Sequence, residues 1–176
     1  MIEEVRDGAP LVQIDRLAVT FYTPRGTVRA VRDASLEIRR GEVVGLVGES
    51  GCGKSTTAFA LMGYLPGTSL VEGSTLFEGK DIAQMSASEL RRLRGNRMAM
   101  VYQDPATSLN PTMRVGPQIK EVLQEHLNLN ARQARQGTAE LFESVGLPEP
   151  DRIGQRYPHQ LSGGMQQRVV IAMALA

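Results

Sequence analysis

The feature that most constrains this chain is the run GESGCGKST at residues 48–56. It contains the pattern G-x-x-x-x-G-K-[ST], with Gly48, Gly53, Lys54 and Ser55 at the fixed positions. Glycines let the backbone wrap closely around phosphate groups, so that its N–H groups can point inward. The pattern predicts a phosphate-binding loop when a strand precedes it and a helix follows it.

The flanking sequence supplies that context. Residues 42–47, EVVGLV, form a short apolar run next to glycines, which is typical of a buried parallel strand. After the loop, Ala58, Leu61, Met62 and Leu65 recur with the period of a helix. The alternative, a glycine-rich turn that matches the pattern by chance, does not explain these flanks.

The chemistry expected of the loop is the binding of a nucleoside triphosphate. Lys54 can reach the β- and γ-phosphates, and the hydroxyl of Ser55 can bind Mg²⁺. The helix that starts near Lys54 adds its positive N-terminal end. We expect the nucleotide to be bound by Gly48, Glu49, Ser50, Gly51, Cys52, Gly53, Lys54, Ser55 and Thr56.

A second motif, LSGGMQQR, occupies residues 161–168. Ser162, Gly163 and Gly164 stand directly before a predicted helix, where a hydroxyl and unhindered N–H groups can bind an anion. The alternative is an ordinary helix cap followed by a flexible hinge.

Together the two motifs resemble the ATP-binding-cassette (ABC) superfamily, although Met165 stands where its signature usually has Gln. The resemblance implies an α/β P-loop NTPase core of ABC type, with an N-terminal antiparallel β part and an inserted helical subdomain. VYQDP at residues 101–105 resembles the family's glutamine loop. Gln103 would then be a catalytic residue that senses Mg²⁺ and the γ-phosphate. Otherwise Gln103 is an ordinary polar residue at the end of a strand.

Two longer strings narrow the resemblance. Residues 103–119, QDPATSLNPTMRVGPQI, and residues 156–176, RYPHQLSGGMQQRVVIAMALA, look like the ATPase subunits of oligopeptide, dipeptide and nickel importers. This resemblance implies ATP and Mg²⁺ as cofactors and a second ABC ATPase subunit, in a homo- or heterodimer. It also implies transmembrane permease subunits bound through the helical subdomain, and a peripheral location on the cytoplasmic face of the membrane.

The family also places an aromatic residue on an N-terminal strand, where it stacks on adenine. Phe21 and Tyr22 are the candidates, and the spacing back from Lys54 favours Phe21. An aromatic face can pack on the π-system of a base. Packing in the core or at its rim is the alternative for either residue.

The chain is expected to form one ABC-type nucleotide-binding domain over residues 1–176. Strands are predicted at residues 11–22, 34–38 and 98–103, with a strand pair over 73–82 and a capping box at residues 86–89. Amphipathic helices are predicted around residues 119–127 and 134–145. The expected parts are a β-rich part with the P-loop core (1–103), a helical subdomain (104–164) and the start of the helix after the signature (165–176).

The composition excludes several classes of protein. With 20 basic and 19 acidic residues, the net charge is +1, which gives no long-range field for nucleic acid. No apolar run approaches the roughly 20 residues that span a bilayer. DNA-repair ATPases with the same two motifs carry coiled coils or zinc modules between them. This chain has neither sustained heptads nor cysteine pairs, since Cys52 is its only cysteine.

Members of the family continue with an apolar strand ending in Asp-Glu and, later, a switch histidine. No such string occurs here, and His126 and His159 both precede the signature. We therefore expect an ATPase by family that is incomplete at its C-terminus. These 176 residues are expected to be inactive alone, because they lack the acidic pair. The alternative is a non-catalytic nucleotide-binding fragment or a pseudogene product.

Overall fold

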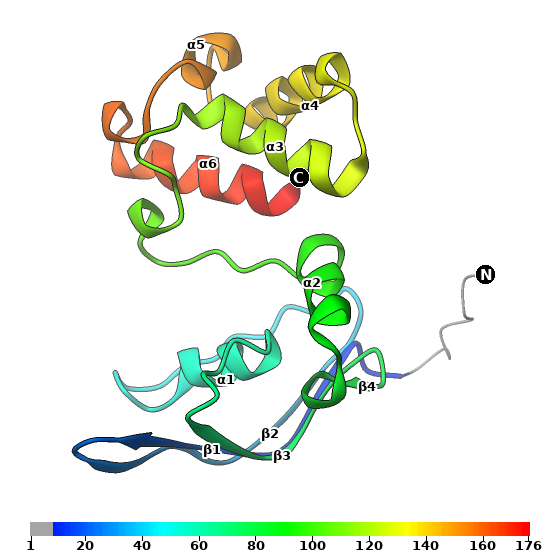
Figure 1. Cartoon of the computed structure of the whole chain (residues 1–176), viewed down its shortest axis with the longest axis vertical. Helices are drawn as coiled ribbons and strands as arrows, with labels where there is room; N and C mark the ends of the chain where they lie inside the picture. Colours follow the sequence, from blue (N-terminus) through cyan, green and yellow to red (C-terminus); the bar gives the residue numbers. More distant parts are fainter. Residues whose placement is uncertain (1–8) are drawn as a thin grey trace. The chain divides into compact units, whose positions relative to one another are not determined.

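The computed structural model describes residues 9–176. The chain forms two compact units, Met1–Arg94 and Gly95–Ala176 (Figure 1). The first contains β1 (Val12–Thr23), β2 (Gly26–Ile38), α1 (Lys54–Leu61), β3 (Ser69–Phe77), β4 (Lys80–Asp81), the 3₁₀ helix η1 (Ile82–Gln84) and most of α2 (Ala87–Asn96). The second contains η2 (Pro105–Thr107), α3 (Val115–Leu127), α4 (Ala131–Ser144), α5 (Pro150–Gly154), η3 (Pro158–Gln160) and α6 (Gly163–Leu175).

The first unit is built on an antiparallel sheet with the strand order β2-β1-β3-β4. Successive side chains of a strand point to opposite faces. On β1, Leu17 and Val19 are fully buried, and Val19 lies opposite Val31 of β2 and Val71 of β3. Helix α1 contacts β2 and β3 (Figure 1). The face that carries Val19 is therefore the core face of the sheet.

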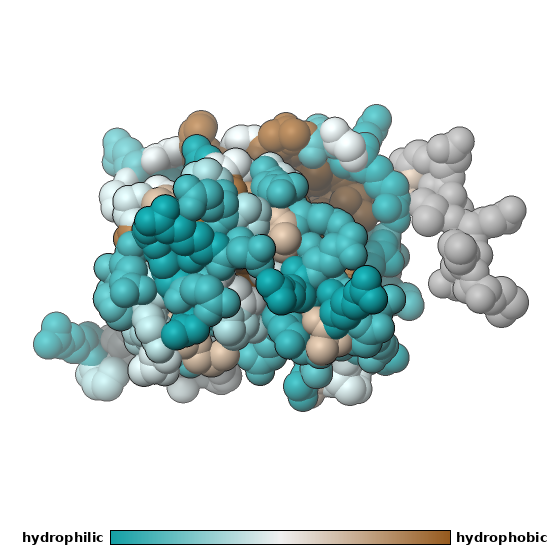
Figure 2. All heavy atoms as spheres, turned by 90° about the horizontal axis from the view of Figure 1, so that it is seen from above, coloured by the Kyte–Doolittle hydropathy of each residue, from teal (hydrophilic) through white to brown (hydrophobic). Residues whose placement is uncertain are grey.

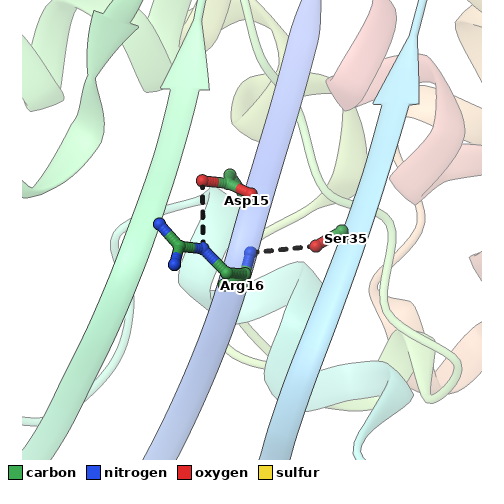
Figure 3. Close-up of polar contacts among 3 residues, drawn as sticks. All are labelled: Asp15, Arg16 and Ser35. Carbon is green, nitrogen blue, oxygen red and sulfur yellow. Dashed lines mark hydrogen bonds and ion pairs between the residues drawn. The ribbon is translucent and has the colours of Figure 1, made fainter.

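A bulge interrupts β1 at Asp15 and Arg16, where its register with both neighbouring strands shifts. Arg16 has a φ of 47°, and its backbone N–H donates to the Ser35 hydroxyl at 2.9 Å (Figure 3). On β3, Gly73 has a φ of 84°, and a Cβ there would lie 2.4 Å from the Arg16 carbonyl oxygen. The close approach of the two strands therefore requires glycine at position 73.

Two predicted strands do not form. Residues 42–47 and 98–103 are in neither a strand nor a helix, and Val43 and Val47 are 96% and 89% exposed. A β-strand exists only when a neighbour receives its backbone hydrogen bonds. No described segment pairs with either run, so the prediction of strands at these positions was wrong for these 176 residues.

Local signals in the first unit are confirmed. The turn near Glu78 and Gly79 joins β3 to β4, as predicted. The capping box at the start of α2 is also present. There the Ser86 backbone N–H donates to the Glu89 carboxylate at 2.8 Å, and the Glu89 N–H donates to the Ser86 hydroxyl at 3.3 Å. These short-range contacts depend only on residues that are adjacent in the sequence.

The second unit has its own apolar core, formed by helices α3, α4, α5 and α6. Phe142 of α4 is its largest fully buried side chain. Gly116 allows the backbone of α3 to approach α5, since a Cβ there would lie 2.9 Å from the Gly154 carbonyl oxygen. Asn130 and Gln133 form a capping box that starts α4. The face drawn in Figure 2 is largely hydrophilic, with hydrophobic side chains in small patches.

Candidate nucleotide-binding site

The phosphate loop has the backbone geometry that its glycines predict. Gly51 and Gly53 have φ values of 82° and 97°, a region that side chains with a Cβ rarely adopt. A Cβ at Gly53 would lie 2.4 Å from the Ala30 carbonyl oxygen and 3.2 Å from Cγ2 of Val31. The loop therefore packs against β2, and position 53 accepts only glycine without displacement of the strand.

The Lys54 ammonium is directed into this loop. Its Nζ donates to the carbonyl oxygens of Gly48 at 2.9 Å and Glu49 at 2.7 Å, and lies 3.5 Å from Sγ of Cys52. The ammonium thus lies inside the curve of the backbone, where an anion enclosed by the loop would meet it. This donor set fits a polyphosphate, because a lysine ammonium and backbone N–H groups are the usual partners of such an anion.

Helix α1 begins directly after the loop. Gly53 is its N-cap and has no side chain to bind the free N–H groups of the first turn. Ser55, in that turn, is exposed. The Thr57 hydroxyl donates to the Gly53 carbonyl oxygen at 3.1 Å and helps to fix the junction. The positive end of the helix therefore adjoins the loop that contains Lys54.

The two aromatic candidates of β1 lie on opposite faces of the sheet. Phe21 follows the alternation of Leu17 and Val19 and therefore lies on the core face, the side of the phosphate loop. Its cross-strand partner, Val28, is 52% exposed. Tyr22 lies on the other face, where it is 58% exposed.

The remaining predicted site residues belong to the second unit. Gln103 is exposed and directly precedes Asp104, whose carboxylate caps η2 by accepting from the Ala106 N–H at 3.0 Å. Ser162 is the N-cap of α6, and its hydroxyl accepts from the Met165 N–H at 3.3 Å. Gln103 therefore lies in a loop and not at the end of the predicted strand, whereas Ser162 lies at a helix start, as the sequence predicts.

Nothing encloses the two signature glycines within the described residues. Gly163 and Gly164 are exposed, and a Cβ at either position would meet no atom within 4 Å. Because they occupy the first turn of α6, their backbone N–H groups are at the positive end of the helix.

The sequence did not predict the residues that fix the start of α6 against the preceding segment. The amide of Gln166 donates to the carbonyl oxygens of Pro158 at 2.9 Å and Leu161 at 3.1 Å. Arg168 donates to the Val145 and Gly146 carbonyl oxygens at 3.2 and 2.7 Å. The only signal in the sequence is the run of polar residues QQR inside an otherwise apolar helix.

No group of three or more His, Cys, Asp or Glu side chains within residues 9–176 is arranged to hold a metal ion. Magnesium at nucleotide sites keeps several waters and is bound by substrate phosphates with few protein ligands. A single hydroxyl, such as that of Ser55, therefore suits the way in which this ion is held.

A glycine-rich phosphate loop followed directly by a helix is the arrangement of a P-loop nucleotide-binding protein. The chain belongs to the ABC transporter family, which residues 31–176 match. This membership and the solved cassettes described below confirm the predicted fold class, an α/β P-loop core of ABC type with an antiparallel β part.

Curated relatives support the predicted subfamily. The oligopeptide transport ATP-binding protein OppD of Escherichia coli K12 is 48% identical over 165 residues, which are 94% of this chain and 49% of OppD. The dipeptide transport ATP-binding protein DppD of Bacillus subtilis is 45% identical over 167 residues, which are 94% of this chain and 50% of DppD. The chain therefore spans about half the length of these relatives.

The fold has close counterparts among solved structures. A dimeric post-hydrolysis state of the ATP-binding cassette MJ0796, bound to ADP and Pi, has a TM-score of 0.82 at 27% identity. The match covers 94% of this chain and 69% of that cassette. The structure of cbiO1 from Clostridium perfringens has a TM-score of 0.73 at 26% identity. Within the described part of this chain, the helices are too short or too polar to cross a membrane.

Proposed function

We propose that this chain is the ATP-binding subunit of an ABC importer, which couples ATP binding and hydrolysis to the uptake of peptides or a related small solute. The observation that carries the proposal is the Lys54 ammonium inside a loop whose Gly51 and Gly53 have left-handed backbone geometry. The names of the relatives OppD and DppD support peptides as the solute.

In this proposal, Lys54 exchanges its bonds to the Gly48 and Glu49 carbonyl oxygens for bonds to the β- and γ-phosphates. The backbone of residues 48–56 encloses the phosphates, and the Ser55 hydroxyl and Gln103 serve as protein ligands for Mg²⁺. When bound, Mg²⁺ would neutralise the charge that develops on the phosphate oxygens. Gln103 acts as the residue that senses the γ-phosphate.

The base and a second subunit complete the proposed site. Phe21 stacks on adenine, which its place on the core face of β1 supports. Ser162, Gly163 and Gly164 offer a hydroxyl and free N–H groups to the nucleotide bound by a second ABC ATPase subunit. The dimeric state of the cassette MJ0796 supports this arrangement.

In this proposal, the second unit, which is helical, binds transmembrane permease subunits. This contact holds the chain at the cytoplasmic face of the membrane as a peripheral subunit. The segment proposed for this contact is residues 104–116, which contain the loop before α3. Cysteine cross-linking from Met113 to a permease loop, in an assembled transporter, tests this part of the proposal.

Binding of a fluorescent ATP analogue with Mg²⁺ tests the site itself. Lys54→Ala removes the only side-chain cation of the loop, so we expect binding to weaken by about 100-fold or more, given roughly 1.5–3 kcal/mol for each charged hydrogen bond. Lys80→Ala, at an exposed lysine of β4, is the matched control and should bind normally. Equal affinity of the two variants would contradict the assignment of the loop.

A second candidate function is nucleotide binding without turnover. It concerns residues 1–176 taken alone, in which no apolar run ends in Asp-Glu. Phosphate release from the 176 residues then stays at the level of Lys54→Ala, although the analogue binds. A Mg²⁺-dependent rate that disappears in Lys54→Ala would instead favour hydrolysis by these residues.

A further inference from the structure

The sheet of the first unit carries a groove of about 330 Å³, lined mainly by residues that alternate with Val19 and Val71 and so lie on the face opposite the phosphate loop. Its floor is the central strand β1, where Ala18 and Thr20 alternate with the buried Val19 and therefore point away from the core. Both floor side chains are small, whereas the residues beside them on β2 and β3 are longer. The groove therefore follows β1 between two walls.

The two walls carry opposite charges. Thr20 lies opposite Arg29 of β2, and Arg32 lines the same side of the groove. Ala18 lies opposite Glu72 of β3, on the other side. Within the part of the chain that the structure describes, these three charged side chains make no ion pair or side-chain hydrogen bond. The opposite charges thus face the same groove without neutralising each other.

The two charged walls stand on strands that are not neighbours in the sheet. Strands β2 and β3 flank β1, so their backbones lie roughly 9.6 Å apart, twice the spacing of neighbouring strands. Arginine offers a planar fork that binds a carboxylate through two parallel hydrogen bonds. A glutamate carboxylate accepts hydrogen bonds from an ammonium group. A ligand with a carboxylate and an ammonium a few ångströms apart would therefore satisfy both walls.

We propose that this groove binds a zwitterionic dipeptide, with its carboxylate on Arg29 and Arg32 and its ammonium on Glu72. An extended dipeptide separates its charged ends by roughly 5–7 Å, since each residue spans at most about 3.6 Å. Tyr22 and Leu70, which are 58% and 44% exposed, provide apolar surface for a side chain of the dipeptide.

The charge pattern distinguishes this ligand from a simple anion. Inorganic phosphate would be attracted by Arg29 and Arg32 but repelled by the carboxylate of Glu72 on the opposite wall. A dipeptide with blocked, uncharged ends would lose its charged hydrogen bonds to both walls. The groove lies on the opposite face from the phosphate loop, so this proposal does not rest on the proposed nucleotide site.

Backbone NMR of the full 176-residue chain, titrated with the dipeptide Ala-Leu, tests the proposal. We expect a dissociation constant on the order of 1 mM, which is typical of a ligand of this size. The amide signals of Ala18 and Thr20 should shift. N-acetyl-Ala-Leu-amide and inorganic phosphate serve as comparison ligands, and both should bind at least about tenfold more weakly.

Three variants locate the binding. Arg29→Gln and Glu72→Gln should each weaken Ala-Leu binding by about tenfold or more, because each removes a charged partner. Arg91→Gln, at an exposed arginine of α2, is the matched control and should leave binding unchanged. All three positions are exposed, and circular dichroism confirms that each variant is folded.

Any of three other outcomes would overturn the proposal. Phosphate binding that equals Ala-Leu binding and strengthens in Glu72→Gln would identify an anion site. Binding that is insensitive to both Arg29→Gln and Glu72→Gln would place the dipeptide elsewhere. No shift of the Ala18 and Thr20 signals at 20-fold the expected dissociation constant, about 20 mM, would show that the groove does not take this ligand.

Discussion

At the scale of single residues, two glycines of the first unit have positions that no other residue could occupy without displacing the backbone. Gly53 lies against the Ala30 carbonyl oxygen, and Gly73 lies against the bulge at Asp15 and Arg16. The phosphate-loop motif alone is enough to identify the role of Gly53. The role of Gly73 could not be predicted, because the bulge that it faces lies on another strand and has no sequence signal.

The substitution Gly73→Ala should therefore destabilise the first unit. The new Cβ would lie 2.4 Å from the Arg16 carbonyl oxygen, at a φ of 84° that alanine rarely adopts. We expect the free energy of unfolding to fall by at least about 2 kcal/mol in a urea titration. Gly67→Ala is the matched control, because a Cβ there has no neighbour within 4 Å and the φ of Gly67 is not left-handed. Equal stability of the two variants would mean that β1 and β3 adjust freely.

At the scale of elements, local signals are predictive and long-range pairing is not. The capping box at Ser86 and Glu89 is predicted from four adjacent residues, and it forms. The helical periods of α3 and α4 are also evident in the sequence, although the short helix α5 is not. Residues 42–47 have the composition of a buried strand, but composition does not supply the neighbour that a strand needs. The residues of the phosphate loop can be identified from the sequence because their pattern is local.

The capping box of α2 predicts a measurable pKa. Hydrogen bonds from the Ser86 hydroxyl and then from its backbone N–H hold the pKa of Glu89 below its ordinary value of 4.5. A carboxyl group with a lowered pKa in the folded state contributes stability above its unfolded pKa. That contribution is lost as the pH falls from about 4.5 through the lower folded value.

Ser86→Ala should raise the pKa of Glu89 toward 4.5, as followed by NMR titration of its side-chain carboxyl carbon. The backbone N–H of residue 86 remains as a donor, so the return should be incomplete. Arg92→Gln is the comparison, and its effect should be smaller, because the charge of Arg92 lowers this pKa less than the Ser86 hydrogen bonds do. A larger change in Arg92→Gln would show that charge rather than hydrogen bonding controls Glu89.

At the scale of the whole molecule, the division of the chain is only partly visible in the sequence. The helical subdomain is expected to begin at residue 104, whereas the second compact unit begins at Gly95 and extends through α6. The sequence could not reveal that α6, which carries the signature, belongs to the apolar core of this unit. Val169 and Val170 of α6 are buried with Phe142 in one cluster, and such contacts depend on tertiary packing.

Because this cluster lies wholly within residues 95–176, that segment should fold by itself. We expect the isolated segment to show a helical circular dichroism spectrum and a cooperative thermal transition. Phe142→Ala should lower its free energy of unfolding by about 3–5 kcal/mol, since it removes a fully buried aromatic ring. Leu127→Ala, at a side chain that is 53% exposed, is the matched large-to-small control and should cost less than about 1 kcal/mol. A segment that melts without cooperativity, or that tolerates Phe142→Ala as well as Leu127→Ala, would show that its core needs the rest of the chain.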